Sequence, residues 1–447
     1  MRIRKLHGIH APYHKNTAAM KPERIAVPAE VVIPMSMHIG APAKLLVGVG
    51  DEVKVGQLIA EAGGYLSAPI HASVSGKVKK LDEIISTAGR NMTAAVITSD
   101  GLQTPSESIT PPTVTNMQEF LDAVRDSGVV GLGGAGFPTS VKLSVKHLSQ
   151  IKAIIINSAE CEPYITSDTR TMLDRADDLW YGIELLQKYL EAKRVVIAIE
   201  DNKPECIALH QERCKKSQGV EVFPLPAMYP QGGEKMLVFN VMNAVVPEGK
   251  LPLDVGAIVI NCTTLACIAQ YIKTGMPLVE KCVTVDGSAV KTPKNLIVPI
   301  GTHLQDVFDA CGGFQSEPRK VLYGGPMMGI AVPDLTVPVL KNTNAVLAFD
   351  AKEGAAFETT ACIKCGRCIA HCPMHLMATD IETAFTLNKP EDLQKLKVNL
   401  CIECGCCSFV CPAKRPLVQT NKLAKAMLAS YVNAKKEAQK EKEAAVK

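Results

Sequence analysis

The chain has 447 residues, of which 47% are hydrophobic and 21% are charged, and these proportions exclude a disordered, collagenous or coiled-coil protein. At roughly 150 residues per domain, the length predicts about three domains. The formal net charge is only +4, and seven lysines less three glutamates after residue 421 already account for it. With 4% aromatic residues and no basic face elsewhere, nucleic-acid binding is not expected.

Nine of the sixteen cysteines lie between Cys362 and Cys411, whereas a secreted disulfide scaffold is short and dense in cysteine throughout. This placement predicts a reduced, intracellular, metal-binding protein. Residues 1–8 are basic but lack an apolar region behind them, so we expect no signal peptide. The longest uncharged run, residues 255–272, contains several polar side chains and predicts a buried strand followed by a helix, not a membrane span.

Residues 25–100 contain short apolar runs separated by Gly and Pro, which predict a small all-β module. Residues 49–59 and 72–78 resemble the lipoyl and biotinyl barrel-sandwich fold, but no lysine stands where that family attaches its cofactor. We therefore expect the fold without the attachment. A segment rich in Pro, Ser and Thr, residues 104–115, is typical of a linker.

From residue 116 to 270 the pattern alternates between helix and strand. Expected strands at 153–157 and 194–199 are separated by an expected helix at 177–190, which favours an α/β domain with a parallel sheet. Residues 275–335 return to short strands with one helix near 304–310 and resemble the soluble ligand-binding β-grasp domain. The tail after residue 416, rich in Ala, Lys and Glu, predicts an exposed helix or a frayed end.

A four-cysteine motif ending in Cys-Pro occurs twice, and each cysteine of the second copy lies 39 residues after its counterpart. Three thiolates on one tight loop can hold three corners of a 4Fe–4S cluster, while the fourth reaches the cluster of the other repeat. The motif therefore predicts two clusters with crossed ligands. One would be held by Cys362, Cys365, Cys368 and Cys411, and the other by Cys401, Cys404, Cys407 and Cys372.

The alternative for these cysteines is a pair of structural zinc sites, but zinc modules place four ligands in two close pairs. Cysteine runs that end in Cys-Pro favour iron. Cys406 is left over and is expected to be a packed thiol. His371 and His375 are expected to face solvent or to lie behind the ligands, since eight thiolates are already available.

Gly131, Gly133 and Gly136 have the spacing of a dinucleotide-binding fingerprint, although an ordinary glycine-rich turn is the alternative. The strand that follows ends with Asn157, and Glu160 and Glu162 come directly after it. Open α/β sheets bind ligands at the carboxyl ends of their strands. The two features together predict a ligand site at this edge.

The strings at 133–139, 160–163, 229–234 and 259–261 resemble, in the same order, the FMN- and NADH-binding subunit of respiratory complex I. With the His-Gly-Ile-His start at 7–10, the whole order of modules resembles the C subunit of the Rnf electron transport complex. Under this resemblance, FMN would be lined by Gly131, Gly133, Gly134, Gly136 and Lys142 and hydrogen-bonded by Asn157, Glu160 and Asn261. The nicotinamide nucleotide would contact Phe137, Glu162 and Tyr229, with Gly232 and Glu234 near both ligands.

The resulting expectation is a multidomain α+β protein. Its parts are a barrel-sandwich module (1–105), an α/β domain for FMN and NADH (116–270), a β-grasp domain of the SLBB type (275–345), a ferredoxin-like domain with two clusters (355–416) and a basic helical tail (417–447). The tail would tune docking to a partner or to an anionic membrane surface.

The resemblance implies a peripheral, NADH-oxidising subunit of an ion-translocating (Na⁺ or H⁺) NADH:ferredoxin oxidoreductase on the cytoplasmic side of the cell membrane. FMN would convert the two-electron hydride of NADH into the single electrons that the clusters accept. The expected partners are the iron–sulfur B subunit and the membrane subunits of Rnf, and ferredoxin indirectly. An NADH-dependent cobalamin reductase and a non-enzymatic iron–sulfur electron carrier are the alternatives.

Overall fold

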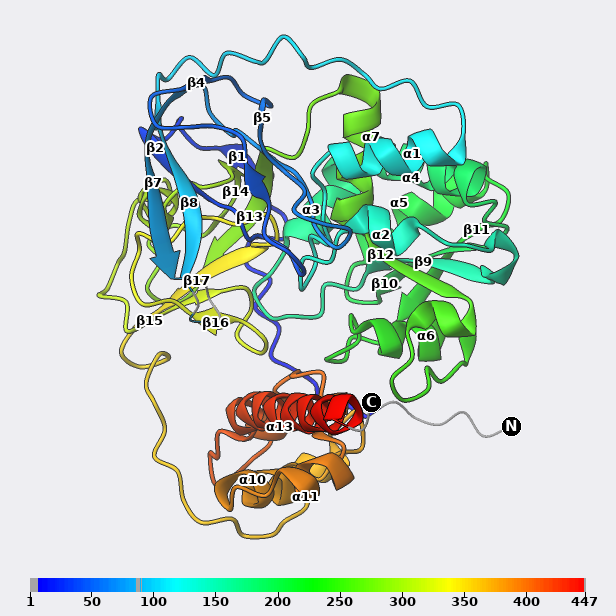
Figure 1. Ribbon diagram of the computed structural model, residues 1–447, viewed down its shortest axis with the longest axis vertical. Coiled ribbons are helices and arrows are strands. Elements are labelled where there is room, and N and C mark those ends of the chain that lie inside the picture. The colour runs from blue at the N-terminus through cyan, green and yellow to red at the C-terminus, as the bar shows by residue number, and fades with distance from the viewer. Residues whose placement is uncertain (1–6, 86–88, 90, 446–447) are drawn as a thin grey trace.

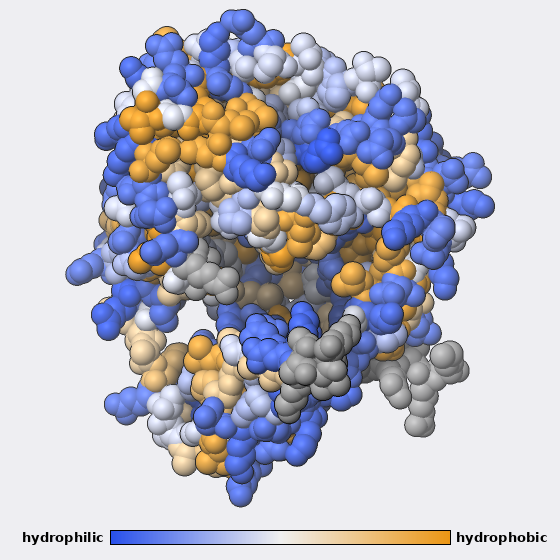
Figure 2. All heavy atoms as spheres, viewed as in Figure 1, coloured by the Kyte–Doolittle hydropathy of each residue, from blue (hydrophilic) through white to orange (hydrophobic). Residues whose placement is uncertain are grey.

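The computed structural model describes residues 7–85, 89 and 91–445. The basic start of the chain, residues 1–6, and Lys447 lie outside the described residues. Figure 1 shows an upper part, with β-rich modules beside an α/β domain, and a helical lobe below it. Figure 2 shows the molecule hollowed between this lobe and the upper part, and apolar side chains gathered over the N-terminal module.

The N-terminal module consists of a four-stranded sheet ordered β2-β8-β7-β4 and a three-stranded sheet ordered β3-β5-β6. Buried Ile33, Ile59, Ile70 and Ile97 fill its core, which confirms the expected all-β module. The strands are β2 (Glu30–Pro34), β3 (Lys44–Leu45), β4 (Glu52–Val53), β5 (Leu58–Glu61), β6 (Ile70–His71), β7 (Gly76–Ile85) and β8 (Asn91–Ser99).

The α/β domain is built on a parallel sheet ordered β11-β10-β9-β12. Strand β10 is buried at every position, as expected for a parallel strand covered on both faces. The uncharged run forms β12 and α7, as predicted. The strands are β9 (Ala153–Ser158), β10 (Val195–Glu200), β11 (Val220–Leu225) and β12 (Ala257–Asn261).

Helices surround this sheet (Figure 1). They are α1 (Met117–Asp126), α2 (Thr139–Leu143), α3 (Ser167–Asp174), α4 (Ala176–Tyr189), α5 (Pro204–Cys214), α6 (Glu234–Met242) and α7 (Cys262–Thr274), with 3₁₀ turns η1 (Leu148–Gln150) and η2 (Pro252–Val255). The sheet order changes direction at β9, because the chain proceeds from β9 to β10 on one side and later adds β12 on the other. Ligands of open α/β sheets bind at such a point.

The β-grasp domain has a six-stranded sheet ordered β1-β14-β13-β17-β15-β16. Its edge strand β1 comes from the N-terminal part of the chain and pairs in parallel with β14. The elements are β1 (Glu23–Arg24), β13 (Glu280–Asp286), β14 (Lys294–Pro299), α8 (Leu304–Asp309), β15 (Lys320–Tyr323), β16 (Ile330–Ala331) and β17 (Ala345–Phe349).

Residues 7–18, here called the N-terminal strap, run from the helical lobe past the α/β domain to the β-grasp sheet (Figure 1). The His7 ring bonds the carbonyl of Ala370, and Ile9 pairs with Tyr229 through two backbone hydrogen bonds of 2.8 and 2.9 Å. A Cβ on Gly8 would lie 2.4 Å from the Tyr229 carbonyl oxygen. Glycine is therefore required at this position of the His-Gly-Ile-His string.

The helical lobe contains both cysteine repeats. Its elements are α9 (Arg367–Ala370), α10 (Ala378–Thr386), α11 (Pro390–Lys395), η3 (Val398–Leu400), α12 (Cys406–Phe409) and α13 (Leu417–Ala445). None of the helices in the described part of the chain is long and apolar enough to cross a membrane.

The C-terminal tail is a helix, as expected, but its first half is packed and not exposed. Leu417 is buried beside the cysteine repeats, and Ala424 and Leu428 are buried with Ile381 and Leu393 of α10 and α11. Buried residues recur every three to four positions, which places them on one helix face. The Lys- and Glu-rich part of the tail is its second half, where residues 433 to 441 are exposed.

Candidate functional site

The two ends of the glycine-rich loop are joined to each other by backbone hydrogen bonding. Val130 pairs with Pro138, and the amide of Gly131 donates to the Phe137 carbonyl at 2.8 Å. Within the loop, the Leu132 amide donates to the Thr264 hydroxyl at 2.9 Å. The Leu132 carbonyl accepts a hydrogen bond from Lys281 Nζ at 2.9 Å. Residues of α7 and β13 thus hold the loop from behind.

The outer side of this loop is accessible backbone. Gly133 and Gly134 are exposed, and a Cβ on Gly134 would meet nothing within 4 Å. A Cβ on Gly133 would lie 2.7 Å from the Asn261 side-chain nitrogen, and Gly136 has a φ of +70°. Side chains at these positions would crowd the site or strain the backbone. The loop therefore leaves room for a planar or phosphate-bearing ligand close to the main chain.

Asn157 and Asn261 lie side by side at the carboxyl ends of β9 and β12, where their Cα atoms are in register. The Asn261 side-chain oxygen accepts from the Thr264 amide at 3.0 Å and so caps α7, while its NH₂ donates to Asp168 at 2.8 Å. The Asn157 NH₂ donates to the Gly232 carbonyl at 2.9 Å. The structure therefore brings these two amides, the glycine loop and Gly232 together.

Lys142, on α2, forms an ion pair with Glu234 at the start of α6 and donates to the Val259 carbonyl at 3.1 Å. This pair connects the helix after the glycine loop to the same sheet edge. The Thr139 hydroxyl, also at the start of α2, is buried and has no hydrogen-bond partner among the described residues. Such a hydroxyl can donate to an oxygen of a bound ligand.

Glu160 is directed toward α3 and not toward the glycine loop. Its carboxylate accepts from the amides of Asp168 and Thr169 at 2.6 and 3.2 Å and from the Thr169 hydroxyl. Burial raises the pKa of Glu160, although the nearby Lys15 ammonium opposes the shift. In this arrangement Glu160 stabilises the start of α3, and its oxygens already have donors within the chain.

Glu162 and Tyr229, both expected at the nucleotide, lie where the α/β domain meets the β-grasp domain and the second cysteine repeat. The Glu162 carboxylate accepts from the amides of Met327 and Met328 at 3.1 and 2.8 Å, and burial raises its pKa to about 7. Tyr229 is 2% exposed and packs with Cys404 and other residues of that repeat. Phe137 is partly buried at the end of the glycine loop.

The second cysteine repeat surrounds a cavity. Four of the residues that line it are Cys372, Cys401, Cys404 and Cys407, and most of the others are apolar. Cys372 belongs to the first repeat in sequence, so the structure brings together the crossed set of four thiols. Among the described residues, no three Cys, His, Asp or Glu side chains are close enough to bind one metal ion. In a four-iron cluster each thiolate binds a different iron atom.

The other four cysteines are nearer the surface. Cys362 and Cys365 are exposed, whereas Cys368 is buried with Leu417, and Cys411 packs at its margin. The leftover thiol, Cys406, is fully buried, with its sulfur 4.0 Å from the Tyr229 carbonyl oxygen.

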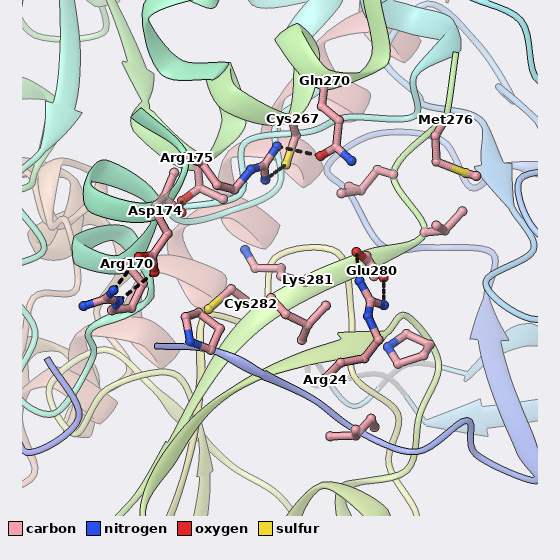
Figure 3. Close-up of a pocket in the computed structure, with 18 of the residues that line it drawn as sticks. Arg24, Arg170, Asp174, Arg175, Cys267, Gln270, Met276, Glu280, Lys281 and Cys282 are labelled. Carbon is pink, nitrogen blue, oxygen red and sulfur yellow. Dashed lines mark hydrogen bonds and ion pairs between the residues drawn. The ribbon is translucent and has the colours of Figure 1, made fainter. Parts of the chain in front are cut away.

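Three polar residues that sequence reasoning did not single out support these sites. Lys15 of the N-terminal strap donates to the carbonyls of Glu160, Glu162 and Ile165 at 2.5–2.8 Å. Lys281 lies between the glycine loop and a large pocket (Figure 3). Asn421 lines the cavity of the second repeat. Lys281 lies beside Glu280 at the start of its strand, so its burial had no clear signal in the sequence.

Comparison with known families agrees with this architecture. Residues 4–102 match the RnfC barrel sandwich hybrid domain, and residues 124–270 match the Nuo51 FMN-binding domain. Residues 282–331 match the SLBB domain, and residues 355–412 match a 4Fe-4S dicluster domain. The fold and the site therefore define a flavin- and iron–sulfur-containing electron-transfer subunit.

Relatives that match over most of this chain and most of their own length identify the family. The chain is 41% identical to the C subunit of the proton-translocating ferredoxin:NAD(+) oxidoreductase complex of Clostridium ljungdahlii, over 83% of this chain and 81% of the relative. It is also 41% identical to the C subunit of the Na(+)-translocating complex of Acetobacterium woodii, over 84% and 85%. The chain belongs to the family of ion-translocating oxidoreductase complex C subunits.

Among solved structures, an NAD⁺-reducing NiFe hydrogenase in the H₂-reduced state is similar over 70% of this chain and 63% of the hydrogenase chain. The sequence identity is 18% and the TM-score 0.49.

Proposed function

We propose that the chain is the peripheral, NADH-oxidising subunit of an ion-translocating NADH:ferredoxin oxidoreductase. The relatives named above are called subunits of ferredoxin:NAD(+) oxidoreductase complexes, one proton-translocating and the other Na(+)-translocating, which supports this proposal. The protein would lie on the cytoplasmic side of the cell membrane, with the iron–sulfur B subunit and the membrane subunits of Rnf as partners and ferredoxin as an indirect one.

FMN would bind over the glycine loop and supply the conversion between two-electron and one-electron transfer. The chain's own residues position it. The open backbone of Gly133 and Gly134 allows close approach, and the fixed amides of Asn157 and Asn261 offer hydrogen bonds at the sheet edge. The Thr139 hydroxyl, which has no hydrogen-bond partner in the described part of the chain, would supply one further donor. NADH would contact Phe137 from the same side.

One observation carries the proposal: the segment at the sheet edge packs directly on the second cysteine repeat. Tyr229 contacts the group that includes Cys404 and Cys406, and a Cβ on Gly233 would lie 3.9 Å from Ile402. The cavity lined by Cys372 and Cys401 is therefore the one beside the flavin domain. We infer that electrons reach this buried cluster first and leave through the exposed cluster at Cys362 and Cys365.

The test is anaerobic purification followed by measurement of iron, sulfide and FMN and by titration with NADH. We expect about eight iron atoms and eight sulfides per chain, as two 4Fe–4S clusters require, and releasable FMN. NADH should bleach the flavin and then the cluster absorbance. Cluster absorbance without releasable FMN and without bleaching would leave only an iron–sulfur carrier. Rapid NADH-driven cob(III)alamin reduction by the isolated chain would favour the cobalamin reductase.

A further inference from the structure

The buried cysteine site contains a side-chain hydrogen-bond donor, Asn421 of α13. Its side-chain nitrogen lies 3.6 Å from the Cys401 sulfur, and the residue is 2% exposed. Its side-chain oxygen is buried and has no hydrogen-bond partner in the part of the chain that the structure describes. A buried carbonyl without a hydrogen-bond partner costs free energy, so an asparagine at such a position needs an explanation.

The chemistry of the ligand set fixes which end of this amide faces the sulfur. A thiolate that binds iron can only accept a hydrogen bond, and the NH₂ group is the only donor in the asparagine side chain. Turning the amide over would place its carbonyl oxygen against the negative sulfur. The observed orientation is therefore the one that a cluster bound at Cys401 requires.

The internal repeat provides a matched comparison within the same chain. The 39-residue shift that relates Cys401 to Cys362 relates Asn421 to Glu382. Glu382 accepts from Arg415 Nε at 2.8 Å, and a carboxylate has no proton to donate to a sulfur.

The backbone donors of the two repeats match at these positions. The Glu403 amide donates to the Cys401 sulfur at 3.4 Å, and the Lys364 amide donates to the Cys362 sulfur at 3.4 Å. At these two equivalent cysteines, the side-chain donor is thus found at the buried site alone among the described residues.

We propose that Asn421 is a positioning residue that acts through Cys401 to raise the reduction potential of the buried cluster. This inference rests on the proposed function, in which Cys401 ligates that cluster. A hydrogen bond to a ligating sulfur draws electron density from the cluster and favours its reduced form, which carries one more negative charge. The amide thereby makes the cluster beside the flavin domain the better electron acceptor, without a change in ligand type.

The experiment is a redox titration of the whole, cluster-loaded chain, followed by electron paramagnetic resonance, for the wild type, Asn421→Leu and Asn421→Asp. Leu removes the donor at similar volume, and Asp keeps the shape but replaces the NH₂ group with an oxygen. We expect one cluster signal to move to lower potential in both variants, while the other signal stays in place. Gln419→Ala, at an exposed position on the same helix turn, is the control and should move neither signal.

A spectroscopic measurement tests the contact between Asn421 and the cluster directly in the wild-type protein. Labelling asparagine side chains with ¹⁵N should give a nitrogen hyperfine coupling on the reduced signal that is absent from Asn421→Leu. Full iron content with both potentials unchanged in the variants, or no such coupling, would overturn the inference and leave the proposed function standing. A wild-type chain that binds no iron–sulfur cluster would overturn both.

Discussion

The flavin site and the cluster sites are stabilised by different kinds of interaction. In the flavin domain, Asn157, Asn261 and Lys142 are already bonded to other parts of the chain. The strands β9, β10 and β12 below them are almost wholly buried. The dicluster domain has two small apolar groups and eight thiols around its expected clusters. A small core is commonly stabilised by metal, and binding energy then becomes folding energy. The flavin site is therefore preorganised by protein contacts, whereas the cluster sites depend on their metal.

The two cysteine repeats show that an identical motif need not create an identical environment. Cys401 and Cys404 lie under the flavin domain and α13, while Cys362 and Cys365 are exposed. The segments that cover each repeat, and not the motif, decide its access to solvent.

The largest expected effect comes from removing a crossed ligand. Cys372→Ala should lower iron by about four atoms per chain, because one 4Fe–4S cluster loses a ligand. FMN content should stay at the wild-type value, since the flavin site is held by protein contacts. Iron analysis and electron paramagnetic resonance measure the cluster loss, and the fluorescence of released FMN measures the flavin.

A double variant tests the crossing itself. If Cys372 and Cys401 hold the same cluster, Cys372→Ala with Cys401→Ala should still leave about four iron atoms. A double variant that loses all iron would contradict the crossed assignment. Cys406→Ala is the matched control and should keep both clusters.

The next effect concerns the packed half of α13. Leu428→Ala should lower the unfolding free energy of the dicluster domain by about 2–5 kcal/mol, the usual cost of a buried Leu-to-Ala change. Leu423→Ala, on the exposed face of the same helix, should change it by less than about 0.5 kcal/mol. The urea midpoint for loss of cluster absorbance measures the difference. Equal midpoints for the two variants would show that the helix is not part of the core.

A smaller effect is expected behind the flavin loop. Lys281→Met leaves the Leu132 carbonyl and the Asn344 side-chain oxygen without their donor. Leaving these buried acceptors unpaired should cost about 1–2 kcal/mol of FMN-binding free energy, which corresponds to a roughly 5–30-fold weaker affinity. Fluorescence titration of the apoprotein with FMN measures this. Lys273→Met, at an exposed lysine on α7, should bind FMN as the wild type does.

Lys281 should also make the free energy of unfolding depend on pH. Burial lowers the pKa of Lys281 from 10.5 to about 8. Between these two values the unfolded chain binds more protons than the folded chain, so the contribution of Lys281 to the unfolding free energy rises with pH. From about pH 8 to pH 10, urea midpoints should therefore rise less in Lys281→Met than in the wild type. An identical rise in both would contradict the shift.

The smallest effect is expected at the end of the tail. Lys436→Gln, at an exposed position, should change the unfolding free energy by no more than about 0.5 kcal/mol. Deletion of residues 433–447 should likewise preserve both clusters, whereas deletion from residue 422 would remove Ala424 and Leu428 from the core. A role of the tail in docking is therefore tested with the shorter deletion, by assembly with the membrane subunits. Normal assembly after that deletion would contradict such a role.

Local patterns were enough to predict the elements that depend on neighbours in sequence. The strands β9 and β10 are mostly apolar runs that the sequence predicts directly. Because open α/β sheets bind ligands at the carboxyl ends of their strands, Asn157 could also be predicted to lie at the ligand site. The features that were not predicted depend on distant partners. Glu160 is held by amides of α3, and Lys281 reaches a carbonyl 149 residues away. The burial of Leu428 depends on Ile381 and Leu393 of other helices, which the composition of the tail does not reveal.

The N-terminal strap has a consequence for how the chain is made. Ala370, the hydrogen-bond partner of His7, is synthesised 363 residues after it. Tyr229, the backbone partner of Ile9, is likewise synthesised long after Ile9. Ile9 can pair with Tyr229 once the α/β domain has been made, whereas His7 can bond Ala370 only after the chain has been synthesised as far as the first cysteine repeat. The contact of the strap with the helical lobe is thus a late step, available only when the cysteines of the first repeat are being synthesised.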